Sequence, residues 1–190
     1  MKMFKRLAAV LLAGVMSLSV LTACGGGKTN EQKVEDAYLT VFSSAFGLED
    51  LKNDDALKTL AKNYLDKSVA EDGSLTNAPF MSPNQVEDDW VADKDGNVTM
   101  VVIPSSDKAA TSLDEADLNQ LDDQDALKAA GEALKQSMNI TPEMTAQLKT
   151  YIKGVGVASV KKGDKYYIAF AVKMSEDALK SGDNTITSNN

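Results

Sequence analysis

Hydrophobic residues in the first half of the 190-residue chain follow the spacing of two amphipathic helices. Between residues 31 and 46 they recur three or four positions apart, so that one helix face is apolar, and Gly47 is suited to end that helix. A second helix is predicted to begin after Asn53 or Asp54, either of which can cap it, and to end at the turn-forming residues 72–74. Its apolar stripe consists of Leu57, Leu60, Ala61, Tyr64, Leu65 and Val69.

The middle of the chain has weaker periodicity and more turn-forming residues. Residues 73–90 contain two prolines and predict a loop. Turn residues at 93–97 lie between two short β-prone runs, 90–91 and 98–103, and this arrangement predicts a β-hairpin. The sequence Ser-Leu-Asp-Glu at 112–115 matches a capping box that would open a short helix.

The second half predicts two further helices and a closing hairpin. Apolar spacing predicts a helix over residues 125–137. Thr-Pro-Glu at 141–143 supplies a cap residue, a proline at the first helical position and an acid in the first turn, so that a helix is predicted from there to Tyr151. Strands are predicted at 155–160 and 165–172, and the second is almost continuously apolar, as is typical of a central strand covered on both faces.

Together these elements predict one α+β domain, in which helices pack around a small, mainly antiparallel sheet. Tyr166 and Tyr167 are neighbours on one predicted strand, so each is expected to face a different side of the sheet. We expect the domain to comprise residues 32–180 and the polar residues 181–190 to form a disordered tail.

The first 24 residues have the pattern of a bacterial lipoprotein signal. Three basic residues among the first six precede an apolar run from 7 to 20, and the following Leu-Thr-Ala-Cys at 21–24 resembles a lipobox. We therefore expect residues 1–23 to be removed, Cys24 to receive a diacylglyceryl group, and residues 24–31 to form a lipidated, flexible tether. The alternative is an ordinary secretory signal with a chance cysteine.

Lipidation of Cys24 predicts a protein anchored to the extracytoplasmic face of a bacterial membrane, and the glycines after it suggest a Gram-positive cell. Removal of residues 1–23 leaves 17 basic and 28 acidic residues, a net charge of −11. So acidic a surface argues against a nucleic-acid partner and against electrostatic attraction to anionic lipid. Attachment is therefore expected to come from the two acyl chains, and the partner is predicted to be an unknown protein, glycan or lipid ligand.

The chain contains no histidine and a single cysteine. Their scarcity excludes Ser–His and Cys–His nucleophiles, the usual general base near neutral pH, and zinc sites built from Cys and His. We predict no catalytic residue, no metal and no cofactor, and a non-catalytic binding or interaction module at the cell envelope. Two alternatives stay open: a hydrolase that works with paired carboxylates, and a carrier of lipid or a small molecule, which needs an apolar cavity on the order of several hundred Å³.

Other candidate sites have simpler structural interpretations. Acidic residues at 114–125 are dense enough to suggest calcium, but the order of an EF-hand loop is absent, and a solvated helix face with capping residues is favoured. The turn at 93–97 is interpreted as a hairpin turn rather than a calcium loop. Trp90 is a candidate contact for a sugar or a partner if exposed, and a core residue otherwise. The methionines of the mature chain are scattered and predict core filling.

Three stretches of the chain match the motifs of a known family. The first, from Phe46-Gly47-Leu48 to Ala61, is similar to an opening Gly-Leu-x-x-Leu … Asp-x-x-Leu … Ala. The second, Met-Asn-Ile-Thr-Pro at 138–142, resembles a Met-Asn-Ser-Pro-Gly-His helix start. The third, Gly-Val-Gly-Val-Ala at 154–158 with the tyrosines at 166–167, resembles a terminal Gly-Val-Gly-Val-Ala … Tyr-Tyr hairpin. All three resemble the bacterial SCP-like form of the CAP superfamily (cysteine-rich secretory, antigen 5 and pathogenesis-related proteins).

The resemblance to CAP proteins implies an α-β-α sandwich with a central groove. Members commonly line that groove with two histidines and two acids that hold a divalent cation. Here Met144 takes the place of one histidine, no histidine is present for the other, and residues 87–90 match the family's Gly-Glu-Asn segment poorly. The resemblance therefore implies a groove that has lost its metal, with Met144 as a candidate groove residue.

Overall fold

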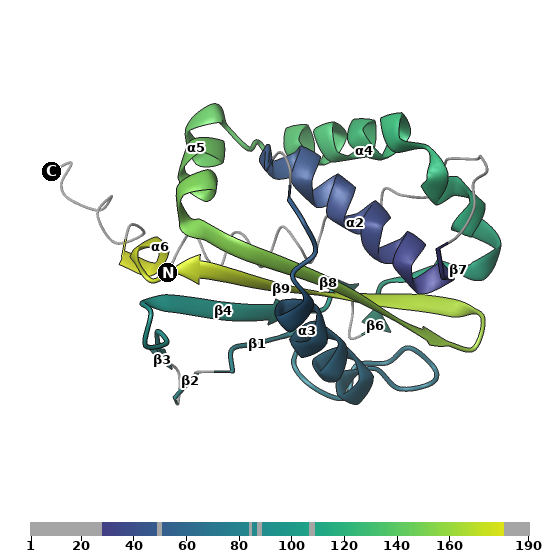
Figure 1. The fold of residues 1–190 in the computed structure, drawn as a ribbon. Helices are drawn as coiled ribbons and strands as arrows, with labels where there is room; N and C mark the ends of the chain where they lie inside the picture. Colours follow the sequence, from purple (N-terminus) through teal and green to yellow (C-terminus); the bar gives the residue numbers. More distant parts are fainter. Residues whose placement is uncertain (1–27, 49–50, 84, 87–88, 107–108, 181–190) are drawn as a thin grey trace, which may run out of the picture.

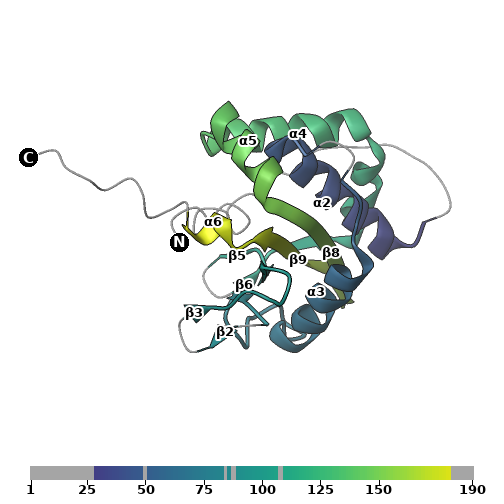
Figure 2. The same cartoon turned by 60° about the vertical axis from the view of Figure 1, so that its left-hand side comes forward.

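A computed structural model describes residues 28–48, 51–83, 85–86, 89–106 and 109–180. It has three layers, with an antiparallel sheet between two layers of helices (Figures 1 and 2). One face of the sheet is covered by α2 (Asn30–Phe46), α4 (Gln124–Ser137) and α5 (Pro142–Tyr151), and the opposite face by α3 (Asp55–Ser68). This arrangement confirms the predicted α+β fold.

The sheet is organised around β9 (Lys165–Ser175), which pairs along its whole length with β8 (Ile152–Lys162). On the other edge of β9, β4 (Asn97–Val102) pairs with its C-terminal half and β7 (Ser112–Asp114) with its N-terminal end. β1 (Phe80–Met81) extends the sheet beyond β4. The structure thus confirms the closing hairpin and the central position of its second strand.

Side chains of β9 alternate between two apolar clusters, one on each side of the sheet. The cluster beneath α2 and α4 receives Tyr166, Ile168, Phe170, Val172 and Met174. The cluster above α3 receives Tyr167, Ala169 and Ala171. Because both faces of the strand are covered, its sequence is apolar at nearly every position rather than at every second one. The opposite orientations expected for the two tyrosines are confirmed.

Gly47, Asp54 and Thr141 lie at the helix ends predicted from the sequence, and α2 has in addition a capping box that was not predicted. Thr29 and Gln32 form a capping box at the start of α2, and Gly47 ends that helix with a positive φ of 63°, a conformation that glycine adopts without strain. Asp54 caps α3, and Thr141 caps α5. The apolar stripe of α3 packs against the sheet as predicted, but the helix ends at Ser68, before the expected turn.

The predicted hairpin around residues 93–97 is wrong in its pairing. The turn itself forms, because the Asp93 carboxylate accepts hydrogen bonds from the amides of Asp95 and Asn97, both at 2.9 Å. However, β3 (Asp89–Trp90) pairs with β2 (Gln85–Val86), and β4 pairs with β9 instead. The run before the turn offers only two β-prone residues, whereas β9 offers β4 six partners and a common apolar core.

The predicted capping box at 112–115 is also replaced by other structure. Its first three residues form β7 and pair with β9, and a 3₁₀ helix, η2 (Glu115–Asp122), follows without a side-chain cap. Strand pairing already engages this backbone, so the box does not form. The predicted loop over 73–90 contains the short strands β1, β2 and β3. Smaller elements are β5 (Ser105–Ser106), β6 (Ala109–Ala110) and α6 (Asp177–Lys180).

Candidate functional site

A pocket of about 510 Å³ lies where the end of α2, the end of α5 and the start of β8 meet. Its lining combines three apolar residues, three lysines, the two residues that lead into α3 and a glycine of β8. The apolar residues are Leu48, Leu51 and Ile152, the lysines are Lys52, Lys149 and Lys153, and the remainder are Asn53, Asp54 and Gly154. These residues come from two segments about a hundred positions apart in the sequence, and only the fold brings them together.

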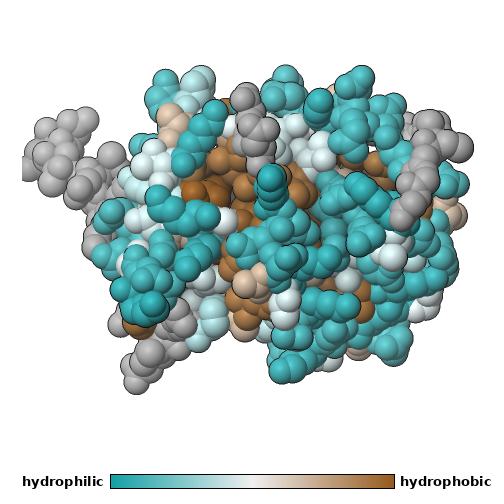
Figure 3. Space-filling model, viewed as in Figure 1, coloured by the Kyte–Doolittle hydropathy of each residue, from teal (hydrophilic) through white to brown (hydrophobic). Residues whose placement is uncertain are grey.

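The apolar part of the pocket is an extension of the larger hydrophobic core. Leu48 is only 8% exposed and belongs to that core, while Leu51 and Ile152 are half-buried and pack against it. Figure 3 shows apolar surface, in brown, exposed between α5 and the segment that follows α2. Apolar surface left open beside charged groups is the usual lining of a small-molecule site.

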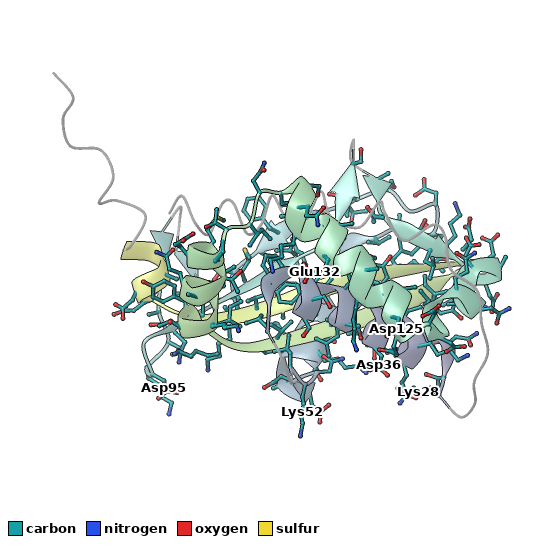
Figure 4. The ribbon with its side chains drawn as sticks, turned by 90° about the horizontal axis from the view of Figure 1, so that it is seen from above. Lys28, Asp36, Lys52, Asp95, Asp125 and Glu132 are labelled. Carbon is teal, nitrogen blue, oxygen red and sulfur yellow. The ribbon has the colours of Figure 1, made fainter. Side chains whose placement is uncertain are left out.

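The three lysines of the pocket differ from most others in the described part of the chain. Nine other lysines there have a carboxylate oxygen within 4.0 Å, whereas no such partner is present for Lys52, Lys149 or Lys153 among the described residues. The Lys153 ammonium donates to the Thr150 carbonyl at 2.9 Å, and the Lys52 side chain points out from the ribbon (Figure 4). Among the described residues of the lining, Asp54 is the one acid beside three lysines, so these residues give the pocket a positive balance of charge.

Local structure fixes the two walls of the pocket. On one side Gly47 turns the chain after α2, and the Ser43 hydroxyl donates to the Leu48 carbonyl. On the other side α5 runs directly into β8, whose register shifts between Ile152 and Gly154. Such a bulge re-aims neighbouring side chains and is frequent beside binding sites.

Asn53 connects the segment before α3 to the edge of β8 by hydrogen bonds. Its side-chain amide donates to the Val157 carbonyl at 2.9 Å, and its side-chain oxygen accepts from the Val157 amide at 2.8 Å. The amide of Asp54 donates to the Val155 carbonyl at 2.9 Å. Asn53 therefore acts as a short substitute for a neighbouring strand and protects this edge from pairing with other chains.

A second, smaller hollow of about 210 Å³ adjoins the pocket and shares Asn53 with it. Four of its charged residues form two ion pairs, Lys58 with Glu35 and Lys28 with Asp36 (Figure 4), and Asp55 also lines it. Since both of its lysines are paired, this hollow offers an anionic ligand less free positive charge than the larger pocket does.

Of the residues proposed from the sequence, only Met144 has a described side chain, and it does not line the pocket. Met144 lies on α5, half-buried against the core, and does not line either hollow. The side chain of Trp90 and all of Cys24 lie outside the described residues. Sequence analysis missed the three pocket lysines, because whether a lysine has an acidic partner depends on contacts between distant segments.

The acidic residues at 114–125 have structural partners. Asp114, Glu115 and Asp122 pair with lysines of β9, β8 and α2, respectively, and Asp123 caps α4. Within the described residues no three acids, cysteines or histidines lie close enough to hold a metal ion. The favoured interpretation of this stretch, as a helix face with capping residues, agrees with these contacts.

In the described part of the chain, every carboxyl group whose pKa is shifted has a lowered pKa. Hydrogen bonds from side chains and backbone amides lower the pKa of Asp72 and of Asp93. At the start of α5, hydrogen bonds from its own amide and from the Thr141 side chain lower the pKa of Glu143. A general acid that works near neutral pH needs a raised pKa instead. Burial raises the pKa of Tyr38, which packs edge-on to Phe170 in the core.

Comparison with protein-family models, with curated proteins and with solved structures finds no match to this chain. The resemblance to CAP proteins therefore stays a prediction from the sequence. Within the described residues, no helix is both long enough and apolar enough to cross a membrane.

Proposed function

We propose that the protein is a lipid-anchored binding module on the extracytoplasmic face of a bacterial membrane, and that its pocket takes a small ligand without changing it chemically. The observation that carries the proposal is the pocket of about 510 Å³ with an apolar floor and lysines around it. Small-molecule sites occupy roughly 300–1,000 Å³ and combine apolar walls with polar groups that orient the ligand, so the pocket has the size of such a site and an apolar part in its lining.

The chemistry of the lining supports binding rather than hydrolysis. Asp54 is the one carboxylate among the described residues of the lining, and its oxygen accepts hydrogen bonds from the amides of Ala56 and Leu57, both at 3.0 Å. It is thus engaged as the cap of α3. A carboxylate-dependent hydrolase needs a second acid at a set separation from the first, and the described lining residues do not include one.

The lipid anchor is proposed from the lipobox and agrees with the position of the first helix. Only five residues separate Cys24 from the start of α2 at Asn30. A fully extended link of that length spans about 20 Å. A lipid on Cys24 would therefore hold the domain next to the membrane surface.

Native mass spectrometry of the full mature chain, released from its membrane in mild detergent, tests the binding function. We expect a small molecule bound at one copy per chain, with the same mass before and after prolonged incubation. Ile152→Gln is expected to weaken its binding about tenfold, because loss of about 1.4 kcal/mol of apolar contact corresponds to that factor.

Leu134→Gln is the matched control for this experiment. Leu134 is another half-buried apolar residue that packs against the core, but it lines neither hollow. Its substitution should leave the bound molecule in place. Conversion of the bound molecule to a product of different mass, or equal loss of it in both variants, would contradict the proposal.

A further inference from the structure

We infer that the ligand of the pocket is a small organic anion, in which an apolar body carries one carboxylate, sulfate or phosphate group. The inference rests on the proposed binding function and adds the chemical class of the ligand. It follows from three observations. The pocket lysines have no carboxylate partner among the described residues, they surround the apolar floor, and the molecule as a whole is acidic.

The pairing of the lysines shows where positive charge is available. In the described part of the chain most lysines stand next to an acid, as Lys161 does next to Glu115 at 2.7 Å. The three lysines of the pocket have no carboxylate within 4.0 Å among the described residues, and all three line the same hollow. In a chain with 28 acidic and 20 basic residues, this concentration of unneutralised ammonium groups favours a negatively charged ligand.

The position of the lysines suits a ligand with two chemically different ends. Lys149 lies in the last turn of α5 and Lys153 just beyond it, while Lys52 approaches from the segment before α3. All three are exposed, whereas Leu48 is buried and Leu51 and Ile152 are half-buried. An apolar body can therefore cover the floor while an anionic group stays at the exposed ammonium groups, which lysine keeps hydrated.

The charge of the whole molecule limits the size of the anion. A net charge of −8 for the chain, and −11 after removal of residues 1–23, repels a polyanion along most of the surface. A neutral ligand would cover the lysines without pairing them, and a cationic ligand would be repelled by them. A compact molecule with one anionic group fits both the local positive charge and the global negative charge.

Isothermal titration of the mature chain bearing Cys24→Ala, which needs no detergent, tests the inference. The probes are octanoate, octanol, octylammonium and acetate, all below their aggregation concentrations. We expect saturable 1:1 binding of octanoate, at least tenfold weaker binding of octanol and of acetate, no binding of octylammonium, and weaker octanoate binding as salt is raised.

Substitution of the lysines distinguishes recognition of an anionic group from non-specific binding of apolar molecules to the pocket. Lys149→Gln and Lys153→Gln should each weaken octanoate binding about three- to tenfold, the range for a partly solvated charge pair, and leave octanol binding unchanged. Lys128→Gln on α4 removes the same charge from another exposed lysine that has no carboxylate partner among the described residues and lines neither hollow. This control variant should bind octanoate like the unsubstituted protein.

A binding experiment with lipid vesicles distinguishes whether the anion is a membrane lipid or a dissolved molecule. Binding to phosphatidylglycerol vesicles but not to phosphatidylcholine vesicles, with loss in Lys149→Gln, would assign the anion to a membrane lipid. Binding of octanoate with no vesicle binding would assign it to a dissolved molecule. Either result supports the inference.

Two further outcomes separate failure of the inference from failure of the proposed function. Octanol binding as tightly as octanoate, or equal losses in Lys128→Gln and Lys149→Gln, would overturn the anionic ligand and leave the binding function standing. Absence of binding by every probe, together with no molecule in native mass spectrometry, would overturn both.

Discussion

At the scale of single residues, Glu35 shows how a buried charge connects three elements. It is 4% exposed and lies on the buried face of α2. One carboxylate oxygen accepts from the Ser159 amide of β8 at 3.2 Å, and the other pairs with Lys58 of α3. Because α2 and α3 cover opposite faces of the sheet, the ion pair passes around the edge of β8 and joins both helix layers there.

We expect Glu35→Ala to lower the free energy of unfolding by about 2–3 kcal/mol, measured by urea denaturation. The substitution leaves the buried Ser159 amide without its acceptor and Lys58 without its partner, and breaking a buried pair costs more than such a pair contributes. The estimate is at the lower end for buried pairs because the Lys58 side chain is 30% exposed.

The neighbouring Asp36 provides the control. It pairs with Lys28, but both side chains are largely open to solvent. Asp36→Ala should therefore change the free energy of unfolding by about 0–1 kcal/mol. Equal effects of the two substitutions would show that Glu35 does not act as a buried connection.

At the scale of secondary-structure elements, the approach of α3 to β8 depends on a glycine. A Cβ atom at Gly156 would lie 2.2 Å from the amide nitrogen of Lys58 and 2.4 Å from the carbonyl carbon of Leu57. Both atoms belong to the helix backbone, which cannot move aside as a side chain can. The absence of a side chain at Gly156 therefore sets how closely the start of α3 packs on the sheet.

We expect Gly156→Ala to destabilise the protein by about 1–3 kcal/mol or more in the same unfolding assay, since overpacking forces the backbone to shift. Gly154→Ala, two positions earlier on β8, is the matched control. A Cβ there would lie 3.1 Å from the end of the Leu57 side chain, which can rotate away, so the loss should be clearly smaller. The opposite order of the two effects would disprove this account of the α3–β8 contact.

The elements also show which sequence predictions succeed. The helices are confirmed because caps such as Thr141 and stops such as Gly47 act on residues within one turn. The closing hairpin is confirmed because its strands are neighbours in the sequence. In contrast, β4 does not pair with the run just before it. It pairs with β9, about seventy residues later, and no local sequence pattern indicates this pairing.

At the scale of the whole molecule, α2 connects the segment that follows the predicted lipid attachment to the pocket. α2 has 17 residues and is therefore about 25 Å long. Its first turn follows the predicted lipid attachment, and its last residue is two positions from Leu48 at the pocket. If Cys24 is lipidated as predicted, the length of α2 contributes to the spacing between the membrane and the proposed binding site.

We expect Cys24→Ala to move the protein from the membrane fraction to the soluble fraction and to abolish labelling with radioactive palmitate in a bacterium that processes lipoproteins. The reason is that two acyl chains hold a protein stably at a membrane, while the acidic surface does not attract anionic lipid. Lys52→Gln, which removes one positive charge from the domain, should leave both fractionation and labelling unchanged. Labelling of the Cys24→Ala variant equal to that of the unsubstituted protein would contradict lipid attachment at Cys24.

The sequence by itself determined the features that depend on neighbouring residues: the helix stripes and caps, the closing hairpin, the central strand with its two covered faces, and hence the α+β fold. It predicted the lipid attachment at Cys24 in the same way, from a short contiguous motif. The tertiary structure alone decided the partner of β4, the buried position of Glu35 and the pocket, whose lysines have no carboxylate partner among the described residues. Each of these depends on two segments distant in the chain, whose meeting is set by the packing of the whole core.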